Sequence, residues 1–199
     1  STYNAEAESK KIKDTQKEMS DWIHALMSIA EIVQLLDNDE SIEQIMEKWL
    51  EILSLQLQVD SAQIFQLYPD KEVMDVVCEW REPSVVSSFD KTSSVKTYSF
   101  LYTEKPLVIS TDKINDLNNG EMYEIDLKAV MIFPIIRQKD GTALVVSLNF
   151  RRAHTWEMTE VKFAADAIRV LQSIITRRVQ KNSLAGSYAA LESVLDNVG

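Results

Sequence analysis

The sequence predicts an α+β fold in which an antiparallel sheet lies between helices from the two ends of the chain. Three observations support this prediction. Two apolar runs in residues 129–150 flank an Asp-Gly pair, residues 161–175 repeat apolar positions at helical spacing, and residues 5–36 contain no Gly or Pro. The chain has 199 residues, which is enough for one domain of ordinary size and additional helices.

Residues 5–36 are predicted to form one long helix with a coiled-coil seam. The seam consists of two heptad series, which are Ile12, Met19, Leu26 and Val33, and Trp22, Ile29 and Leu36. We therefore interpret residues 1–38 as a signalling helix that joins two copies of the chain. The alternative is a helix packed on its own domain. Four further apolar residues widen the stripe and favour such packing for part of the helix, and they are Ile23, Met27, Ala30 and Ile32.

Residues 37–41 interrupt this helix and can cap the next one, which is predicted at residues 42–57. Two strands follow at residues 62–67 and 73–81, because both segments are rich in strand-forming residues and a Pro-Asp-Lys turn separates them. This part of the chain is therefore predicted to be a helix followed by a first β-hairpin.

A second hairpin is predicted at residues 129–150. Asp140 and Gly141 supply the positive backbone angles that a tight hairpin turn requires. Each strand has apolar residues on both faces, as strands in the middle of a layered domain do. The helix that follows has an apolar stripe that would cover one face of the sheet. The stripe consists of Val161, Ala164, Ile168, Leu171 and Ile175.

The composition argues against several classes of protein. A formal net charge of −10 argues against nucleic-acid binding, because phosphate contacts need clustered Lys and Arg. The basic cluster Arg177, Arg178 and Lys181 is interpreted as complementing the negative end of a helix. A single cysteine, Cys78, excludes an internal disulfide and favours a cytoplasmic protein. No apolar run approaches the roughly 20 residues of a membrane span, so no membrane segment is predicted.

The sequence shows no catalytic or metal-binding motif. His24 and His154 are the only histidines, and neither has a cysteine or an acidic pair nearby at metal-ligand spacing. We expect His154 to have a capping or surface role. A Gly-rich phosphate loop and a nucleophile elbow are also absent. We therefore predict that this domain has no catalytic residues, is not an enzyme and holds no metal.

Several features follow one another in a set order between residues 132 and 163. They are a strand with Phe-Pro-Ile at residues 132–136, Gly141 in the hairpin, a strand at residues 145–150, and then Arg151, Arg152, Trp156, Glu160 and Phe163. This order resembles the C-terminal half of a GAF domain, the small-molecule sensor fold of bacterial signalling proteins. The resemblance extends more weakly back to Ile42 and implies a GAF-like sensor domain at residues 39–182.

The resemblance implies that residues 82–128 form a lid of short helices and loops over the sheet, with a ligand cavity beneath it. The candidate pocket residues are Trp80, Tyr98, Phe100, Tyr123, Met131 and Phe133. A pocket of this kind is mostly apolar, with a few placed polar groups. The alternative is that these side chains only fill the core.

The cofactor or ligand is unknown from the sequence. Bilin-binding members attach their chromophore through a cysteine in or near the lid, whereas Cys78 falls in a predicted strand. The Asn-Lys, Phe and Asp-Glu pattern of cyclic-nucleotide-binding members is absent. The enzymatic relative, a free methionine sulfoxide reductase, uses several cysteines for its thiol chemistry. Nothing in the sequence indicates haem or a metal.

Residues 183–199 are predicted to be a linker and the start of a following module. A helix break is expected at residues 183–187, where Ser and Gly occur together. Residues 191–197 resemble the first helix of a PAS domain, and a plain trailing helix is the alternative.

These features lead to one predicted function and one alternative. The chain is interpreted as the small-molecule-sensing GAF domain of a multidomain bacterial signalling protein. Its partners are a second copy of itself, bound through the terminal helices, and a small molecule of unknown identity. The helices would pass the ligand state to an output domain, either one for cyclic-dinucleotide turnover or a histidine kinase. The alternative is a dimerising spacer that binds no ligand.

Overall fold

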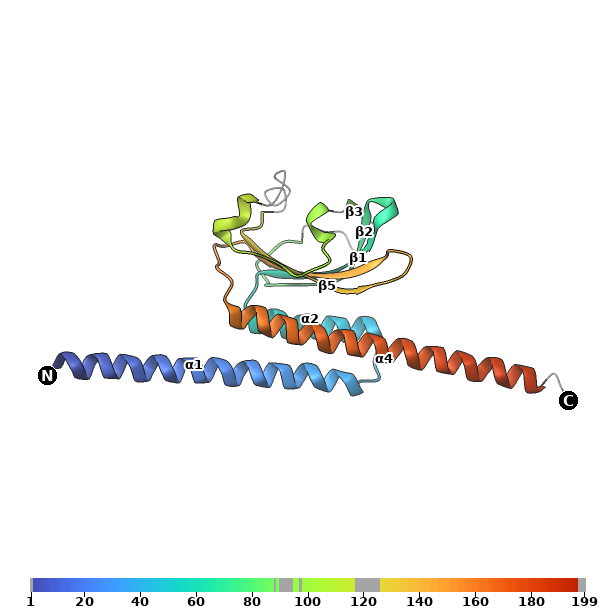
Figure 1. Ribbon diagram of the computed structural model, residues 1–199, viewed down its shortest axis with the longest axis horizontal. Coiled ribbons are helices and arrows are strands. Elements are labelled where there is room, and N and C mark those ends of the chain that lie inside the picture. Colours follow the sequence, from blue (N-terminus) through green and yellow to red (C-terminus); the bar gives the residue numbers. More distant parts are fainter. Residues whose placement is uncertain (1, 88, 90–94, 97, 117–125, 197–199) are drawn as a thin grey trace.

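The computed structural model describes residues 2–87, 89, 95–96, 98–116 and 126–196, and Figure 1 shows their arrangement. The sheet lies against a layer of helices. Helix α1 projects from this layer toward the N-terminus and helix α4 projects in the opposite direction toward the C-terminus. The predicted α+β fold is confirmed. No helix in the described part of the chain is long and apolar enough to cross a membrane.

The helix layer is built from α1 (Thr2–Gln34), α2 (Ile42–Leu57) and α4 (Met158–Asp196). A capping box begins α2, because Ser41 accepts a hydrogen bond from the Gln44 N–H and the Gln44 side chain bonds back to Ser41. The helix predicted at residues 42–57 is confirmed. Between α1 and α2 lies a 3-10 turn, η1 (Leu35–Asp37).

The sheet has six strands in the order β3-β2-β1-β6-β5-β4, and all the pairs are antiparallel. The strands are β1 (Ser61–Tyr68), β2 (Val73–Arg81), β3 (Val95–Lys96), β4 (Leu107–Ile109), β5 (Ala129–Arg137) and β6 (Ala143–Phe150). A 3-10 turn, η2 (Pro69–Lys71), joins β1 to β2. Both predicted hairpins are confirmed, and β1 and β6 form the centre of the sheet.

The turn between β5 and β6 differs in detail from the prediction. Gly141 takes a positive φ of 88°, but Asp140 does not. The Asp140 carboxylate instead accepts the backbone N–H of Thr142 at 3.0 Å. Hydrogen bonds from Thr142 lower the pKa of Asp140. The predicted positive angle at Asp140 is therefore wrong, because this residue stabilises the turn with its side chain.

A β-bulge in β2 decides which of its residues face the helices. Ile64 pairs with Cys78 whereas the next residue of β1 pairs with Val76, so Val77 is the extra residue. One extra residue shifts the alternation of side chains along the strand by one position. Val76 therefore packs on the side away from the helices, Cys78 packs in the helix-facing core, and Glu79 again lies away from the helices.

The main core lies between the sheet and the helices. Trp49 of α2 is fully buried there, and its indole N–H donates to the carbonyl oxygen of Ala167 at 2.9 Å. The predicted stripe of α4 is buried at Ala164, Ile168 and Leu171. These contacts confirm that α4 covers one face of the sheet.

Short segments between β2 and β5 cover the opposite face. They include two 3-10 helices, η3 (Ser99–Leu101) and η4 (Thr111–Asp116), while β3 and β4 from the same part of the chain extend the sheet at its two edges. Leu101 is buried in a second apolar cluster that also contains residues of β1, β2, β5 and β6. We call the described residues 95–96 and 98–116 the lid.

Helix α1 presents different faces to the domain and to solvent. Ile32 is buried and Ile29 packs partly against the core, as does Leu36 in the following turn η1. The other seam residues are exposed, and they are Ile12, Met19, Trp22, Leu26 and Val33. Each interpretation of this helix therefore describes part of it, and the dimer stays a prediction.

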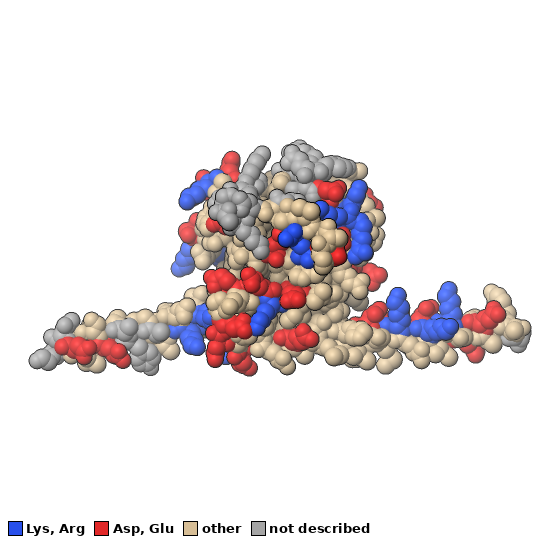
Figure 2. All heavy atoms as spheres, turned by 180° about the vertical axis from the view of Figure 1, so that it is seen from behind, with Lys and Arg blue, Asp and Glu red and all other residues tan. Residues whose placement is uncertain are grey.

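Charged side chains lie along the projecting part of α1 and over the helix layer. Figure 2 shows Lys and Arg beside Asp and Glu along the projecting part of α1, and acidic side chains over the helix layer. The exposed side of α2 contributes Glu43, Glu47 and Glu51. The charges along α1 leave its exposed apolar stripe as a separate face.

Helix α4 continues to Asp196, so the helix break predicted at residues 183–187 is wrong. One glycine costs a helix only about 1 kcal/mol relative to alanine, and extending an existing helix needs no new nucleus. Gly186 is therefore accommodated within the helix. The domain boundary at residue 183 stays a prediction.

The basic cluster of α4 lies in the middle of the helix, so its interpretation as a partner of the helix end is wrong. The Arg178 guanidinium donates to the carbonyl oxygens of Asn38 and Glu40, at 3.3 and 2.9 Å. Arg178 thereby ties α4 to the connection between α1 and α2.

Candidate functional site

A polar pocket lies on the lid side of the sheet, at the end where β2, β1 and β6 lie side by side. The strands form its floor, and residues that follow β2 form its roof. The polar floor residues are Ser61, Gln63, Glu79, Arg81, Ser147 and Asn149. Polar side chains thus gather at one end of a sheet face whose other end is apolar.

Amide and hydroxyl groups bond one another across the floor. The Asn149 amide donates to Gln63 Oε1 at 2.7 Å and to Ser61 Oγ at 3.3 Å. The Ser147 hydroxyl donates to Asn149 Oδ1 at 2.6 Å. The strand register brings these groups together, because Ser61 pairs with Asn149 and Gln63 pairs with Ser147. All four residues are buried, and buried polar groups need such partners.

Glu79 adds a buried carboxylate to this network. Its side chain is 3% exposed. One carboxylate oxygen accepts from the Gln63 amide at 2.9 Å, and the other accepts from the Ser87 hydroxyl at 2.6 Å. The Arg81 Nε lies 3.3 Å from the second oxygen, so its positive charge offsets part of the cost of burying the carboxylate. The bulge at Val77 is what turns Glu79 to this side of the sheet.

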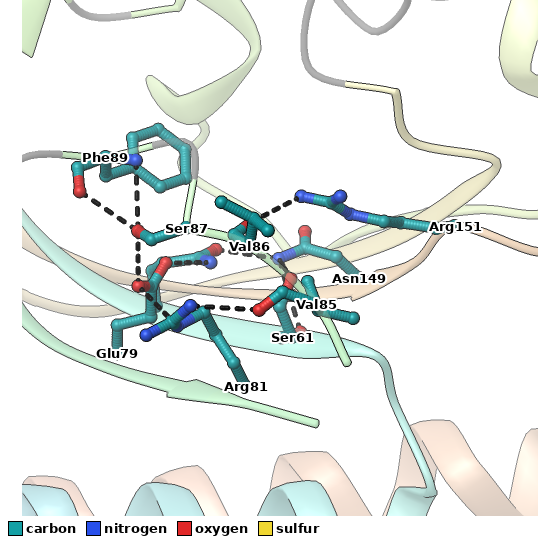
Figure 3. A network of polar contacts seen from close by, with 10 residues as sticks. Ser61, Glu79, Arg81, Val85, Val86, Ser87, Phe89, Asn149 and Arg151 are labelled. Atoms are coloured by element: carbon teal, nitrogen blue, oxygen red, sulfur yellow. Dashed lines mark hydrogen bonds and ion pairs between the residues drawn. The ribbon is translucent and has the colours of Figure 1, made fainter. Parts of the chain in front are cut away.

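Two arginines bond the chain segment above the floor. Arg81 donates to the carbonyl oxygen of Val85 at 2.9 Å, and Arg151 donates to that of Val86 at 3.2 Å (Figure 3). Arg151 follows β6, and its backbone N–H donates to the Asp60 carboxylate at 2.7 Å. The polar end of the pocket therefore holds two cationic groups and one anionic group.

The roof of the pocket is largely aromatic. Phe89 meets Phe65 edge to face, with ring centroids 5.2 Å apart, and Tyr98 stacks on Phe100 at 5.5 Å. The space inside that is open to the centre of a water molecule is about 20 Å³, which is room for about one water. A larger ligand therefore requires part of the roof to move.

The structure divides the candidate pocket residues between the two sides of the sheet. Tyr98 and Phe100 line the pocket. Met131 and Phe133 are buried in the helix-facing core, and Trp80 packs against that core. The predicted assignment of Met131, Phe133 and Trp80 to the pocket is therefore wrong. Alternation along β5 and the bulge in β2 turn these three side chains toward the helices.

The sixth candidate, Tyr123, lies outside the described residues.

The polar floor was not predicted from the sequence. A signal for it existed in β6, where Ser147 and Asn149 occupy alternate positions of an otherwise apolar strand. Side chains at alternate positions of a strand share one face, so these two residues marked the polar side.

His154 lies outside the pocket, just before α4. Its Nε2 is 3.0 and 3.1 Å from the carboxylate oxygens of Glu160, and its ring stacks on Phe150 with centroids 4.0 Å apart. Glu160 also accepts the Glu157 N–H at 2.8 Å and so caps the helix. His154 thus contacts the capping residue instead of capping the helix itself. No three His, Cys, Asp or Glu residues of the described chain group as a metal site would require.

The lid is hydrogen-bonded to the beginning of α4. The N–H and hydroxyl of Thr111 donate to the His154 carbonyl oxygen at 3.0 and 3.1 Å, and the His154 N–H donates to Thr111 Oγ1 at 2.8 Å. The N–H of Trp156 donates to Ser110 Oγ at 3.0 Å, and its indole N–H donates to the Ile109 carbonyl oxygen at 3.1 Å. We call these contacts the lid–α4 junction.

No family model matches the chain, and no curated protein matches it in sequence. Solved structures are similar to it in fold. One is the GAF domain of a phosphoenolpyruvate-protein phosphotransferase from Coxiella burnetii, with a TM-score of 0.59, 14% identity, and coverage of 81% of this chain and 98% of that chain. Another is the phycocyanobilin-bound GAF domain of a cyanobacterial phytochrome, with a TM-score of 0.61, 13% identity, and coverage of 77% and 94%.

A third similar structure is an enzyme. It is the free methionine-R-sulfoxide reductase from Neisseria meningitidis in complex with its substrate, with a TM-score of 0.60 and 6% identity. The match covers 79% of this chain and 91% of the reductase. At such identities the likeness concerns the fold alone.

Proposed function

We propose that this chain, which has the GAF-domain fold, is a regulatory domain that senses a small molecule. The ligand binds in the polar pocket under the roof, and the terminal helices transmit the bound state. One observation carries the proposal. Gln63, Glu79, Asn149 and two arginines converge on one end of the sheet face that the lid covers.

Stability alone does not account for this polar floor. Burying amides and charges costs free energy, and apolar side chains of similar volume often stabilise a fold at least as well. On the helix-facing side, the same strands carry apolar residues such as Ile64 and Leu148. Polar groups held in fixed positions beside an aromatic roof are the usual elements of a small-molecule site.

A dimerising spacer without a ligand is the alternative function. The small space in the pocket, about 20 Å³, favours it, because the roof fills most of the volume. A spacer function, however, does not require a buried carboxylate such as that of Glu79, which costs free energy to bury. The two functions differ in whether any small molecule displaces the roof.

The lid–α4 junction supports a route from the pocket to the helices. Tyr98 and Phe100 belong to the roof, and β4 and η4 follow them in the chain. A ligand that repositions the roof alters the lid and, through Thr111 and Trp156, the first turn of α4. Such a ligand shifts the domain only by its difference in affinity for the two arrangements.

The proposed partner of the projecting helices is a second copy of this chain. The exposed seam of α1 consists of apolar residues at heptad spacing, and the projecting part of α4 adds Leu184, Leu191 and Leu195, which are also exposed. In Figure 1, α1 and α4 run in the same direction. Two chains side by side in parallel could therefore use both seams, which is the arrangement of a parallel coiled coil.

The proposal includes no catalytic step. The thiol of Cys78 is 1% exposed and lies in the helix-facing core, away from the pocket, so reductase chemistry at a thiol is not part of it. The output domain, for cyclic-dinucleotide turnover or a histidine kinase, stays a prediction.

Native and denaturing mass spectrometry test the proposal. The protein and its Asn149→Leu variant are incubated with the small-molecule fraction of a bacterial extract. We expect a dimer with extra mass that denaturation removes, and no extra mass on Asn149→Leu. Leu55→Ala, a change on the exposed side of α2, is the control and should keep the extra mass. A dimer that never carries extra mass would overturn the sensor function, and a monomer would overturn the dimer.

A further inference from the structure

A short strap, residues 82–87, leaves β2 and crosses the polar end of the pocket (Figure 3). Its start is attached to the body of the domain, because the Glu82 N–H donates to the Asp60 carbonyl oxygen at 3.0 Å. The Val85 N–H then donates to the Glu82 carbonyl oxygen at 2.9 Å and closes a turn. The strap is therefore anchored at one end and lies over the pocket at the other.

The strap contacts each charged group at the polar end of the pocket. The contacts are Arg81 to the Val85 carbonyl oxygen at 2.9 Å, Arg151 to the Val86 carbonyl oxygen at 3.2 Å, and the Ser87 hydroxyl to the Glu79 carboxylate at 2.6 Å. In each contact the strap contributes a neutral group. The strap thus offers two acceptors to the cations and one donor to the anion.

Little apolar burial holds the strap in place. The side chain of Val86 is 76% exposed, and Pro83 and Ser84 are exposed as well. The net contribution of each hydrogen bond is modest, because water replaces the strap as a partner when the strap leaves. A ligand that bonds the charged groups of the pocket more strongly can therefore displace the strap.

We propose that the strap stands in for the ligand, and that the ligand is a small α-amino carboxylate with an apolar or aromatic side chain. This inference rests on the sensor function proposed above. The ligand carboxylate replaces the two carbonyl oxygens on Arg81 and Arg151. The ligand ammonium group replaces the Ser87 hydroxyl on Glu79.

The charges of the pocket select this class of molecule. A carboxylate brings a negative charge to the two guanidinium groups and can accept two parallel N–H bonds, neither of which a neutral peptide oxygen does, so a carboxylate is a better partner for the arginines than the strap carbonyls. An anion without a donor would meet the negative charge of Glu79. A cation without a carboxylate would leave Arg81 and Arg151 to the strap.

The roof accounts for the apolar part of the ligand. Phe89 follows the strap in the chain and covers the ring of Phe65. When the strap leaves, Phe89 moves with it, and the ring of Phe65 becomes available beside Tyr98 and Phe100. An aromatic side chain on the ligand restores an aromatic contact of the kind that Phe89 made.

Competition between strap and ligand has a measurable consequence. The Ser87→Ala substitution removes the bond from the strap to Glu79 and the two bonds between Ser87 Oγ and the backbone of Phe89, at 3.0 and 3.1 Å, but no contact of the ligand. The open arrangement becomes more populated, so the apparent affinity for the ligand increases. A substitution in the pocket itself, such as Arg151→Met or Glu79→Gln, removes a contact of the ligand and lowers the affinity.

Isothermal titration calorimetry on the full chain tests the inference with three related probes. L-phenylalanine has both charged groups, 3-phenylpropionate lacks the ammonium group, and 2-phenylethylamine lacks the carboxylate. We expect L-phenylalanine to bind at least about tenfold more tightly than either of the others. Arg151→Met should weaken its binding about tenfold. Ser87→Ala should strengthen it, and Ser173→Ala, on the exposed side of α4, should leave it unchanged.

Each opposite result overturns a defined part of the inference. Equal binding of 3-phenylpropionate and L-phenylalanine would remove the role of Glu79, and weaker binding by Ser87→Ala would remove the strap as a competitor. If no probe binds but native mass spectrometry shows a mass that Asn149→Leu loses, the ligand class is wrong and the sensor function stands. If that mass is absent too, both are wrong.

Discussion

At the pocket end of β1 and β6, the two faces of the sheet are equally buried and chemically opposite. The helix-facing residues are Ala62, Ile64, Val146 and Leu148, and the lid-facing residues are Ser61, Gln63, Ser147 and Asn149, each at most 4% exposed. Burial therefore does not separate core from site in this domain. The two faces differ in the interactions that their buried side chains make with neighbouring residues.

Apolar contacts on the helix-facing side need only close packing, whereas each polar group on the lid side needs a partner in a particular direction. The first requirement serves stability and the second serves recognition. Substitutions on the helix-facing side should therefore lower stability most. Substitutions on the lid side should change binding at a smaller cost in stability.

The largest expected effect is that of Phe133→Ala. Phe133 is 3% exposed in the helix-facing core, so its removal leaves a cavity and should lower the free energy of unfolding by about 3–5 kcal/mol. Urea denaturation measures this change. Tyr98→Ala, in the roof of the pocket, should cost less. Equal losses in the two variants would contradict the division between the faces.

A smaller loss is expected for Asn149→Leu on the lid side. The change leaves the Ser147 hydroxyl and Gln63 Oε1 without their partner and should cost about 1–3 kcal/mol in the same urea assay. Ser147→Ala should cost less, because Asn149 keeps its bond to Gln63. If Asn149→Leu were more stable than the wild type, the network would exist for recognition alone.

Thr111→Val tests whether the lid side is connected to the helix side through the lid–α4 junction. The substitution keeps the volume of Thr111 but removes its hydroxyl from His154, which should cost about 1 kcal/mol. We expect faster hydrogen exchange at the first turn of α4, including the Val161 amide. Thr142→Val, at the β5–β6 turn, should leave this exchange unchanged. Equal exchange in both variants would show that the junction does not hold the helix end.

The smallest effect is expected at the end of β1, where Tyr68 bonds Asp75 at 2.9 Å. This hydrogen bond, with some burial and the negative charge of Asp75, raises the pKa of Tyr68 above 10.0. Because the folded-state pKa is raised, the bond stabilises the protein below the unfolded pKa and the stabilisation is lost as pH rises through the folded pKa. Thermal unfolding above about pH 10 should therefore lose less stability in Tyr68→Phe than in the wild type. An unchanged alkaline profile would contradict this assignment.

Much of the fold could be predicted because its signals are local. The predicted helix at residues 42–57 and strand at residues 73–81 match α2 and β2, since a capping residue, an apolar stripe and a proline turn lie within a few positions of each boundary. The helix break predicted at residues 183–187 is wrong, because the local Gly-Ser signal was weaker than the tendency of an existing helix to continue.

The candidate site could be predicted only in part. Ser147 and Asn149 mark a polar face within one strand, so the sequence contains that signal. The orientation of Glu79 depends on the bulge at Val77, which exists only where β2 pairs with β1. Trp80 and Phe133 were misplaced because aromatic character says nothing about which face of a sheet a side chain occupies.

The sequence by itself determined α1, α2, the two hairpins, the beginning of α4 and the long exposed seam, because hydrophobic periodicity, caps and turns act over a few residues. Only the tertiary structure decided which face became core and which became pocket. The direction of a strand side chain depends on register with strands far away in the chain, as Ser61 with Asn149 shows. The two arginines and the strap likewise meet only after β2 and β6 have been brought to either side of β1.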